Sequence, residues 1–210
     1  MKSKRALIVI IFLSALMVTA FAAFETKPQV RVENKYRYDT RQDNHGLYTA
    51  RFMAAFNYLN NDKKPVFNIA PFFEDRFNLH RNTWERRELG VEIGKDVFPW
   101  LYLGEGLQQV WLKEDYRNYG LYEKHEQFES ESRFMLKHSL FKNEKFELNA
   151  FAVNEYTYDF RRGAGIRNEL CGGLILPIGK NIETDLAWRH IDRIHYYDSD
   201  VVETSITLIF

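Results

Sequence analysis

The chain has 210 residues, with 29 basic and 29 acidic side chains, a formal net charge of zero and a single cysteine. This balance gives no basic footprint for nucleic acid, and the lone Cys171 excludes an internal disulfide. Aromatic residues make up 16% of the chain and charged residues 28%. The fold therefore has to keep two large and incompatible populations of side chains apart.

The first residues resemble an export signal. The basic stretch KSKR precedes an apolar run from Ala6 to about Val18, and Ala20-Phe21-Ala22 follows as a small-residue cleavage site. We predict a signal peptide over residues 1–22 and one mature domain over residues 23–210, with 26 basic and 29 acidic side chains and a net charge of −3. An uncleaved anchor is the alternative, but the apolar run is short for a span of about 20 residues.

After the signal, apolar and polar side chains alternate with a period of two, which is typical of β-strands. The predicted strands cover residues 29–39, 47–58, 66–78, 85–95, 101–113, 127–140, 146–158, 166–176, 182–197 and 201–210. The fifth is the least regular, because Glu105 and Gln109 share a face with Leu103 and Leu107. The sixth is also ambiguous, so the pattern allows eight, ten or twelve strands.

Two architectures fit this alternation. One is a soluble periplasmic barrel, similar to a lipocalin, that buries its apolar face around a ligand. The other is a barrel that turns its apolar face to lipid. Strand length favours the second, because membrane strands need about 9–11 residues and soluble strands average about 5–6. Short connections also alternate with longer ones. We predict an all-β fold: one antiparallel up-and-down transmembrane β-barrel of about ten strands in the outer membrane, with the lipid bilayer as its partner.

Aromatic residues fall where two membrane interfaces would cross these strands, as expected for such barrels. The predicted interface residues are Tyr58, Phe67, Trp100, Phe146 and Phe210 at the periplasmic end, and Trp111 and Tyr156 at the outer end. An aromatic last residue then anchors the strand that closes the barrel.

A charge pattern recurs at an offset of 81 residues. It matches Glu74 with Glu155, Arg86 with Arg167, and Glu88 with Glu169. Each copy occupies a predicted hairpin, so we expect lumen ion pairs that join Glu74 to Arg86 and Glu155 to Arg167. Long charged side chains would fill much of a ten-stranded lumen, which favours a structural plug. A solute path lined by the same charges is the alternative.

Catalytic and metal-binding chemistry finds weaker support. Asp192 and His195 would lie together at the outer rim, where a His and Asp pair could activate water. The omptin proteases use such residues on a ten-stranded barrel, but no second carboxylate pair accompanies them in this sequence. His45, His80 and His125 have no metal-ligand spacing. We expect no enzymatic activity, metal or cofactor, with a hydrolase as the alternative.

The stretches "VENKYRYD", "WERRELGVEIGKDVFPWLYLGEG" and "IRNELCGGLILPIGKNIETDLAWRHI", together with the terminal Phe, resemble small bacterial outer-membrane β-barrels of an uncharacterised family. The resemblance implies assembly by the outer-membrane insertion machinery, which reads an aromatic-ended last strand. It implies no reaction. The expected role is a structural barrel or a narrow small-solute channel, and the oligomeric state stays open.

Overall fold

The computed structural model of the protein describes residues 28–41, 46–59, 62, 65–113, 126–143, 146–194 and 198–210. The predicted signal peptide lies outside them. The strands are β1 (Gln29–Asp39), β2 (Gly46–Leu59), β3 (Pro65–Asn78), β4 (Thr83–Phe98), β5 (Leu101–Leu112), β6 (Glu126–Lys142), β7 (Glu147–Asp159), β8 (Ala164–Ile178), β9 (Ile182–Arg193) and β10 (Ser199–Ile209). No helix in this part of the chain is long and apolar enough to cross a membrane.

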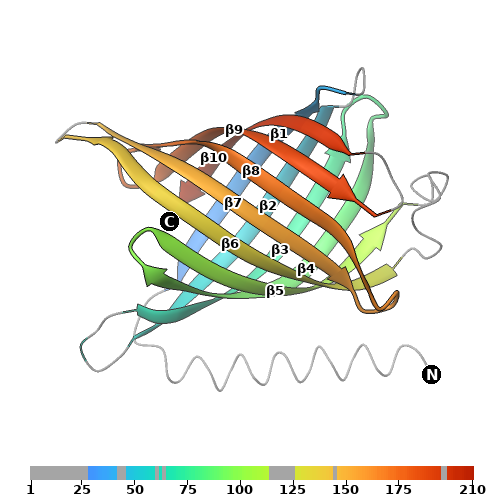
Figure 1. The fold of residues 1–210 in the computed structure, drawn as a ribbon, viewed down its shortest axis with the longest axis horizontal. Coiled ribbons are helices and arrows are strands. Elements are labelled where there is room, and N and C mark those ends of the chain that lie inside the picture. Colours follow the sequence, from blue (N-terminus) through green and yellow to red (C-terminus); the bar gives the residue numbers. More distant parts are fainter. Residues whose placement is uncertain are drawn as a thin grey trace.

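The strands form a closed barrel (Figure 1). Each strand pairs antiparallel with its neighbours in the sequence, and β1 pairs with β10 to close the ring. At the closure, the Val30 amide donates to the Phe210 carbonyl at 3.2 Å and the Phe210 amide donates to the Val30 carbonyl at 2.9 Å. The predicted ten-stranded up-and-down barrel is therefore confirmed, and closure leaves no free sheet edge.

Up-and-down topology places the connections at two ends. The links after β2, β4, β6 and β8 lie together with Phe210, and we call this the turn end; the other links form the loop end. The predicted difference in connection length is concentrated in one link, the 13 residues between Leu112 and Glu126. The link after β7 is shorter than predicted, because β8 already begins at Ala164.

Strand bounds agree with the prediction to within two residues, except at the ends of β4 and β9. The alternation of β4 fades after Lys95, but its pairing with β5 continues to Phe98, with a register shift between Asp96 and Phe98. A bulge breaks the period of two without ending the strand, so the sequence pattern stops early. Strand β9 ends at Arg193, before the predicted Tyr197, which lies outside the described residues.

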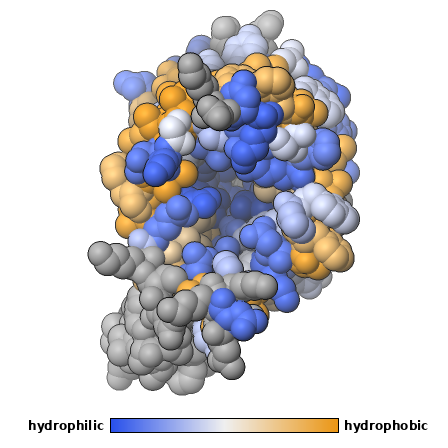
Figure 2. Space-filling model, turned by 90° about the vertical axis from the view of Figure 1, so that its left-hand side faces the viewer, coloured by the Kyte–Doolittle hydropathy of each residue, from blue (hydrophilic) through white to orange (hydrophobic). Residues whose placement is uncertain are grey.

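The two faces of the barrel differ in chemistry. On β4, Leu89 and Ile93 are 50% and 51% exposed on the outer face, whereas Glu88 and Glu92 are 5% and 7% exposed on the inner face. Viewed at the turn end, hydrophobic residues surround the circumference and hydrophilic residues line a central hollow (Figure 2). This is the reverse of a water-soluble barrel, in which the apolar face is buried.

Part of the inner face is apolar. Val153, Cys171 and Ala187, from β7, β8 and β9, form a small buried cluster, with Met135 and Phe151 packed against it. On β7, this cluster lies on the turn-end side of the charged Glu155, because that strand runs from the turn end to the loop end. Along β7, the charged part of the inner face therefore lies nearer the loop end than the apolar cluster does.

Two adjacent glycines give a test of how tightly the backbones pack. A Cβ atom added to Gly173 would lie 2.3 Å from the Leu186 carbonyl oxygen and 2.7 Å from the Ala187 Cα atom. One added to Gly172 would meet only the Phe151 carbonyl oxygen, at 3.8 Å. We expect Gly173→Ala to lower the free energy of unfolding by about 1–3 kcal/mol, because backbone atoms have to shift.

Gly172→Ala is the matched control and should change the free energy of unfolding by less than about 0.5 kcal/mol. Urea unfolding of each variant in detergent micelles, followed by tryptophan fluorescence, measures both values. Equal unfolding midpoints for the two variants would contradict the packing described for β8 and β9.

Candidate functional site: the charged lumen

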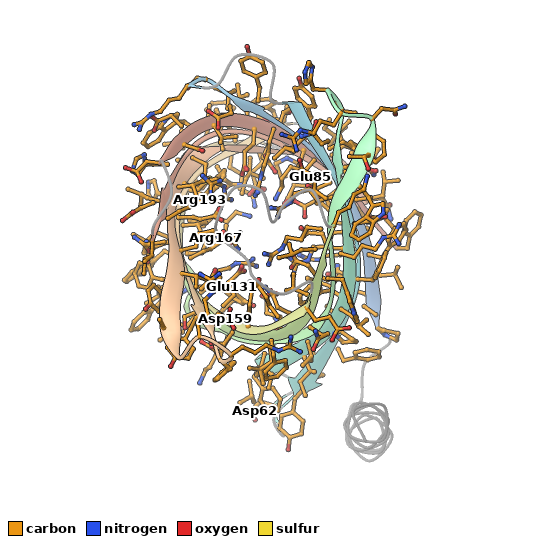
Figure 3. The ribbon with its side chains drawn as sticks, turned by 90° about the vertical axis from the view of Figure 1, so that its right-hand side faces the viewer. Asp62, Glu85, Glu131, Asp159, Arg167 and Arg193 are labelled. Carbon is orange, nitrogen blue, oxygen red and sulfur yellow. The ribbon has the colours of Figure 1, made fainter. Side chains whose placement is uncertain are left out.

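The candidate site is the charged inner face of the barrel. Because successive side chains on a strand point to opposite faces, every second residue of each strand faces the lumen. Seen at the loop end, Glu131 on β6 and Arg167 on β8 point into the interior (Figure 3). Ion pairs join strands that are not neighbours, such as Arg133 on β6 and Glu92 on β4. Such pairs require both side chains to lie inside the tube.

The predicted pairing of Glu74 with Arg86 is wrong, although both side chains are buried on the inner face. The register sets Glu74 opposite Glu88 and Arg76 opposite Arg86. Arg86 is therefore a diagonal neighbour of Glu74, because the bulge that adds Glu85 to β4 places Arg86 on the inner face. Glu74 instead pairs with Arg76 at 3.2 Å and with Arg51 at 3.7 Å.

Glu155 and Arg167 are also diagonal neighbours on the inner face, and the predicted pairing between them is wrong because each pairs with other residues. A register shift between Thr157 and Tyr158 sets Glu155 opposite Glu169 and Thr157 opposite Arg167. Arg167 pairs along its own strand with Glu169, at 2.8 Å. Arg86 and Glu88 also pair along one strand. The two copies of the repeat therefore share an ion pair between an Arg and the Glu two residues after it.

Arg189 on β9 is the first of two hubs, by which we mean arginines that each pair with several carboxylates. It neutralises Glu155 and Glu169, which face each other. Its guanidinium lies 2.5 Å from Glu155, 2.6 Å from Glu169 and 3.0 Å from Glu203. The contact with Glu203 is a fork, because Nε and Nη2 each donate to one carboxylate oxygen at 3.0 Å. Arg37 pairs with the same Glu203 at 2.8 Å. A planar guanidinium suits this shared contact better than an ammonium group.

Arg133 on β6 is the second hub. It pairs with Glu155 at 2.8 Å, with Glu131 on its own strand at 3.0 Å, and with Glu92 at 3.0 Å. Glu92 lies two strands away, on β4, so the side chain of Arg133 has to cross β5. The β5 residue opposite Arg133 is Gly104, which has no side chain to block that path.

These contacts join into one chain of alternating charge across the lumen. In order, it runs through Glu203, Arg189, Glu155, Arg133, Glu92 and Arg51, from β10 to β2. The Tyr102 hydroxyl donates to Glu92 at 2.7 Å and further fixes that carboxylate. Glu155 is the shared member of both hubs. The chain crosses the tube without leaving an excess of one sign along its length.

A second group lies nearer the loop end. Glu129 on β6 is fully buried, and it accepts hydrogen bonds from Arg86 at 2.8 Å and from Gln108 at 3.2 Å. Arg86 also pairs with Glu88, which approaches Arg76 at 3.9 Å. Arg76 connects through Glu74 to Arg51. The two groups therefore form one connected network.

Residues considered for catalysis lie elsewhere. Asp192 is exposed on the outer face of β9, opposite Asn168 on β8, and His195 lies outside the described residues. The nearby His190 instead contacts Asp200, at 2.9 Å between Nδ1 and Oδ1. His45 and His125 also lie outside the described residues, among which no group of three His, Cys, Asp or Glu side chains is placed to hold a metal ion.

The aromatic residues predicted for the interfaces lie near the two ends of the barrel. At the turn end, Tyr58 stacks on Phe67 with ring centroids 5.0 Å apart, and Trp100 stacks on Phe98 at 5.2 Å. Phe210 is 71% exposed there. The remaining members, Phe146 at the turn end and Trp111 and Tyr156 toward the loop end, occupy strand ends or their flanks.

The sequence analysis missed the hub role of Arg189 and Arg133. Both lie on faces predicted to be charged, but their partners come from strands distant in the sequence. A local clue for Arg133 is Gly104 together with Gly106, two glycines on the inner face of β5. Glycine within a strand often marks a close approach of other groups.

No protein-family model matches the chain, and no curated protein matches it. Among solved structures, the "KdgM porin in complex with disordered oligogalacturonate" is similar with a TM-score of 0.45 and 11% identity, covering 87% of this chain and 99% of that one. A "Bacterial polysaccharide outer membrane secretin" gives 0.45 and 14%, covering 88% and 70%. The NanC porin gives 0.36 and 12%, covering 87% and 99%. Similarity at this level says nothing about activity. The assignment of the fold rests on the strand pairing described above.

Removal of the Arg189 hub should strongly destabilise the barrel. Arg189→Ala would leave the carboxylates of Glu155, Glu169 and Glu203 close together without the cation that they share. Removing one partner of a buried ion pair lowers the free energy of unfolding by about 3–5 kcal/mol. Arg189→Lys should recover part of this loss, because it restores the charge but not the fork. Urea unfolding in micelles measures the free energy.

The exposed Arg31 of β1 provides the control. Arg31→Ala should change the free energy of unfolding by less than about 0.5 kcal/mol. An Arg189→Ala protein as stable as the Arg31→Ala protein would show that the lumen carboxylates do not depend on this hub.

Proposed function

We propose that the protein is an outer-membrane β-barrel that acts as a narrow channel for small, polar solutes and ions. The observation that carries this proposal is the combination of an apolar outer face with a hydrophilic hollow that one charge-balanced network crosses (Figures 2 and 3). The function requires no catalytic residue.

Three features support a membrane location. The strands are 11–17 residues long, enough to cross a hydrocarbon core at a tilt. Large hydrophobic side chains are exposed on the outer face along the strands. Aromatic residues gather at both ends of the barrel, where they would meet the two interfaces. Together with the predicted signal peptide, these features favour the outer membrane, with assembly by its insertion machinery.

The network favours a narrow path. Long side chains from β4, β6, β7 and β9 meet inside the lumen through the Arg189 and Arg133 hubs, so the open cross-section of the tube is reduced there. Because carboxylates and guanidiniums alternate along the network, the constriction offers hydrogen-bonding groups of both kinds. Such a surface suits small hydrated solutes of either sign and disfavours apolar ones.

The two alternatives fit less well. A lipocalin-like barrel would need an apolar cavity, whereas the described inner face is largely charged and its apolar cluster is already packed by Met135 and Phe151. A hydrolase would need its groups to converge on one point, whereas Asp192 lies on the outer face of β9.

Single-channel recording in planar bilayers tests the channel and its constriction. Arg133→Ala should raise the conductance, because it removes the side chain that crosses β5, and should shift the reversal potential in a salt gradient toward cation selectivity. Glu131→Gln should shift that potential the opposite way, because Arg133 and Arg167 then lack one of their carboxylates.

Arg87→Ala is the control. Arg87 lies on the outer face of β4, where it pairs with Asp75 at 3.3 Å, so its loss should leave conductance and selectivity unchanged. Correctly inserted wild-type and Arg133→Ala proteins that both fail to conduct would contradict the channel and leave a structural barrel.

A further inference from the structure

The outer face of the barrel carries a polar patch that channel function does not explain. Glu105 on β5 is exposed on the same face as Leu103 and Leu107. The register sets it opposite Ser132 on β6, whose hydroxyl donates to the Glu105 carboxylate at 2.6 Å. Asn154 on β7 lies opposite Phe134 and is a diagonal neighbour of Ser132. We call Glu105, Ser132 and Asn154 the outer polar patch.

The patch lies at mid-height. On β5, Glu105 is five residues from Trp100 and six residues from Trp111, so it is almost equally far from the aromatic residues at the two ends. Leu103 and Leu107, its neighbours on the outer face, are 42% and 43% exposed. A charged side chain on the lipid face is most unfavourable at the bilayer midplane.

Contacts within the barrel leave the carboxylate of Glu105 poorly satisfied. It can accept about four hydrogen bonds, and Ser132 provides one. The Asn154 amide instead donates to the Asn168 side chain at 3.0 Å and to the Glu169 carbonyl at 3.3 Å. Among the described residues, no Lys or Arg forms an ion pair with Glu105. In a bilayer, this carboxylate would need donors from outside the chain.

Two small residues lie beside Glu105 on the outer face, Ser130 and Ser132 of β6. Larger side chains surround this notch, among them Phe134, which is 43% exposed, and Tyr156 opposite Ser132, which is 44% exposed. Small residues let two membrane proteins approach closely enough for hydrogen bonds between backbones and short side chains.

We propose that the outer polar patch is the interface for a second copy of this chain. A twofold interface brings the same surface together from both subunits, so the patch must complement itself. It does, because it holds a carboxylate acceptor on β5 and a second hydroxyl group, that of Ser130, on β6 beside the Ser132 hydroxyl that donates to Glu105. A twofold axis near Ser132 places each Glu105 against the Ser130 hydroxyl of the partner subunit. Lipid chains offer no donor at this depth.

This inference depends on the proposed membrane location but not on conduction. Cross-linking in isolated outer membranes tests it. In a Cys171→Ser background, Ser132→Cys places the only thiol in the patch, and Ala50→Cys places it on the outer face of β2 as a matched control. A short bismaleimide should give a band of twice the monomer mass with Ser132→Cys, and monomer only with Ala50→Cys.

Glu105→Leu should weaken the interface and leave the barrel intact. We expect it to weaken dimerisation by about tenfold or more, read by light scattering in detergent and by loss of the cross-link in the Ser132→Cys protein. Asn34→Leu is the control. Asn34 is also a polar residue on the outer face, on β1, where it contacts the Tyr48 hydroxyl, and its replacement should leave the dimer unchanged.

The outcomes are distinguishable. A cross-linked dimer that requires Glu105 supports the inference. A folded, membrane-embedded protein that stays monomeric, or an adduct whose mass is not twice that of the chain, overturns it without affecting the channel. Absence of the wild-type protein from the membrane fraction would contradict the proposed location itself.

Discussion

The barrel depends on the mutual neutralisation of charges that share a closed interior. Once the strands close, the side chains on the inner face of the described strands cannot reach bulk solvent freely, and ion pairs have to be completed across the tube. Glu155 is an example of such neutralisation, because it pairs with Arg133 on β6 and with Arg189 on β9. The same contacts link β6, β7 and β9, so the ion pairs inside the lumen also stabilise the barrel wall.

Backbone irregularity is part of this arrangement. The two hairpins that carry the repeated charges each have a register shift near the loop end, at Arg76 and at Thr157. Each shift brings two glutamates face to face, and each glutamate pair then recruits an arginine from another strand. On β5, Gly104 provides the gap through which Arg133 reaches Glu92. Bulges and a glycine thus determine which charges meet.

Much of the fold could be predicted from the sequence because its main signal is local. Alternation with a period of two identifies each strand and its two faces, and the ten predicted segments correspond to the ten strands. The ion pairs could not be predicted in the same way. Glu74 and Arg86 are diagonal neighbours on the inner face, but each pairs with a residue of its own strand, which the register alone does not predict. The hub contacts of Arg189 and Arg133 join distant segments, so no spacing along the chain reveals them.

The closure of β1 on β10 has a consequence for how the barrel forms. Arg37 and Glu203, which pair across this seam, are 166 positions apart, so their contact belongs to the slow, non-local class of folding events. Until the last strand is in place, both seam strands present unpaired backbone groups and the charged interior is open. The contact between Arg37 and Glu203 therefore has to wait until the intervening strands have brought β1 and β10 together.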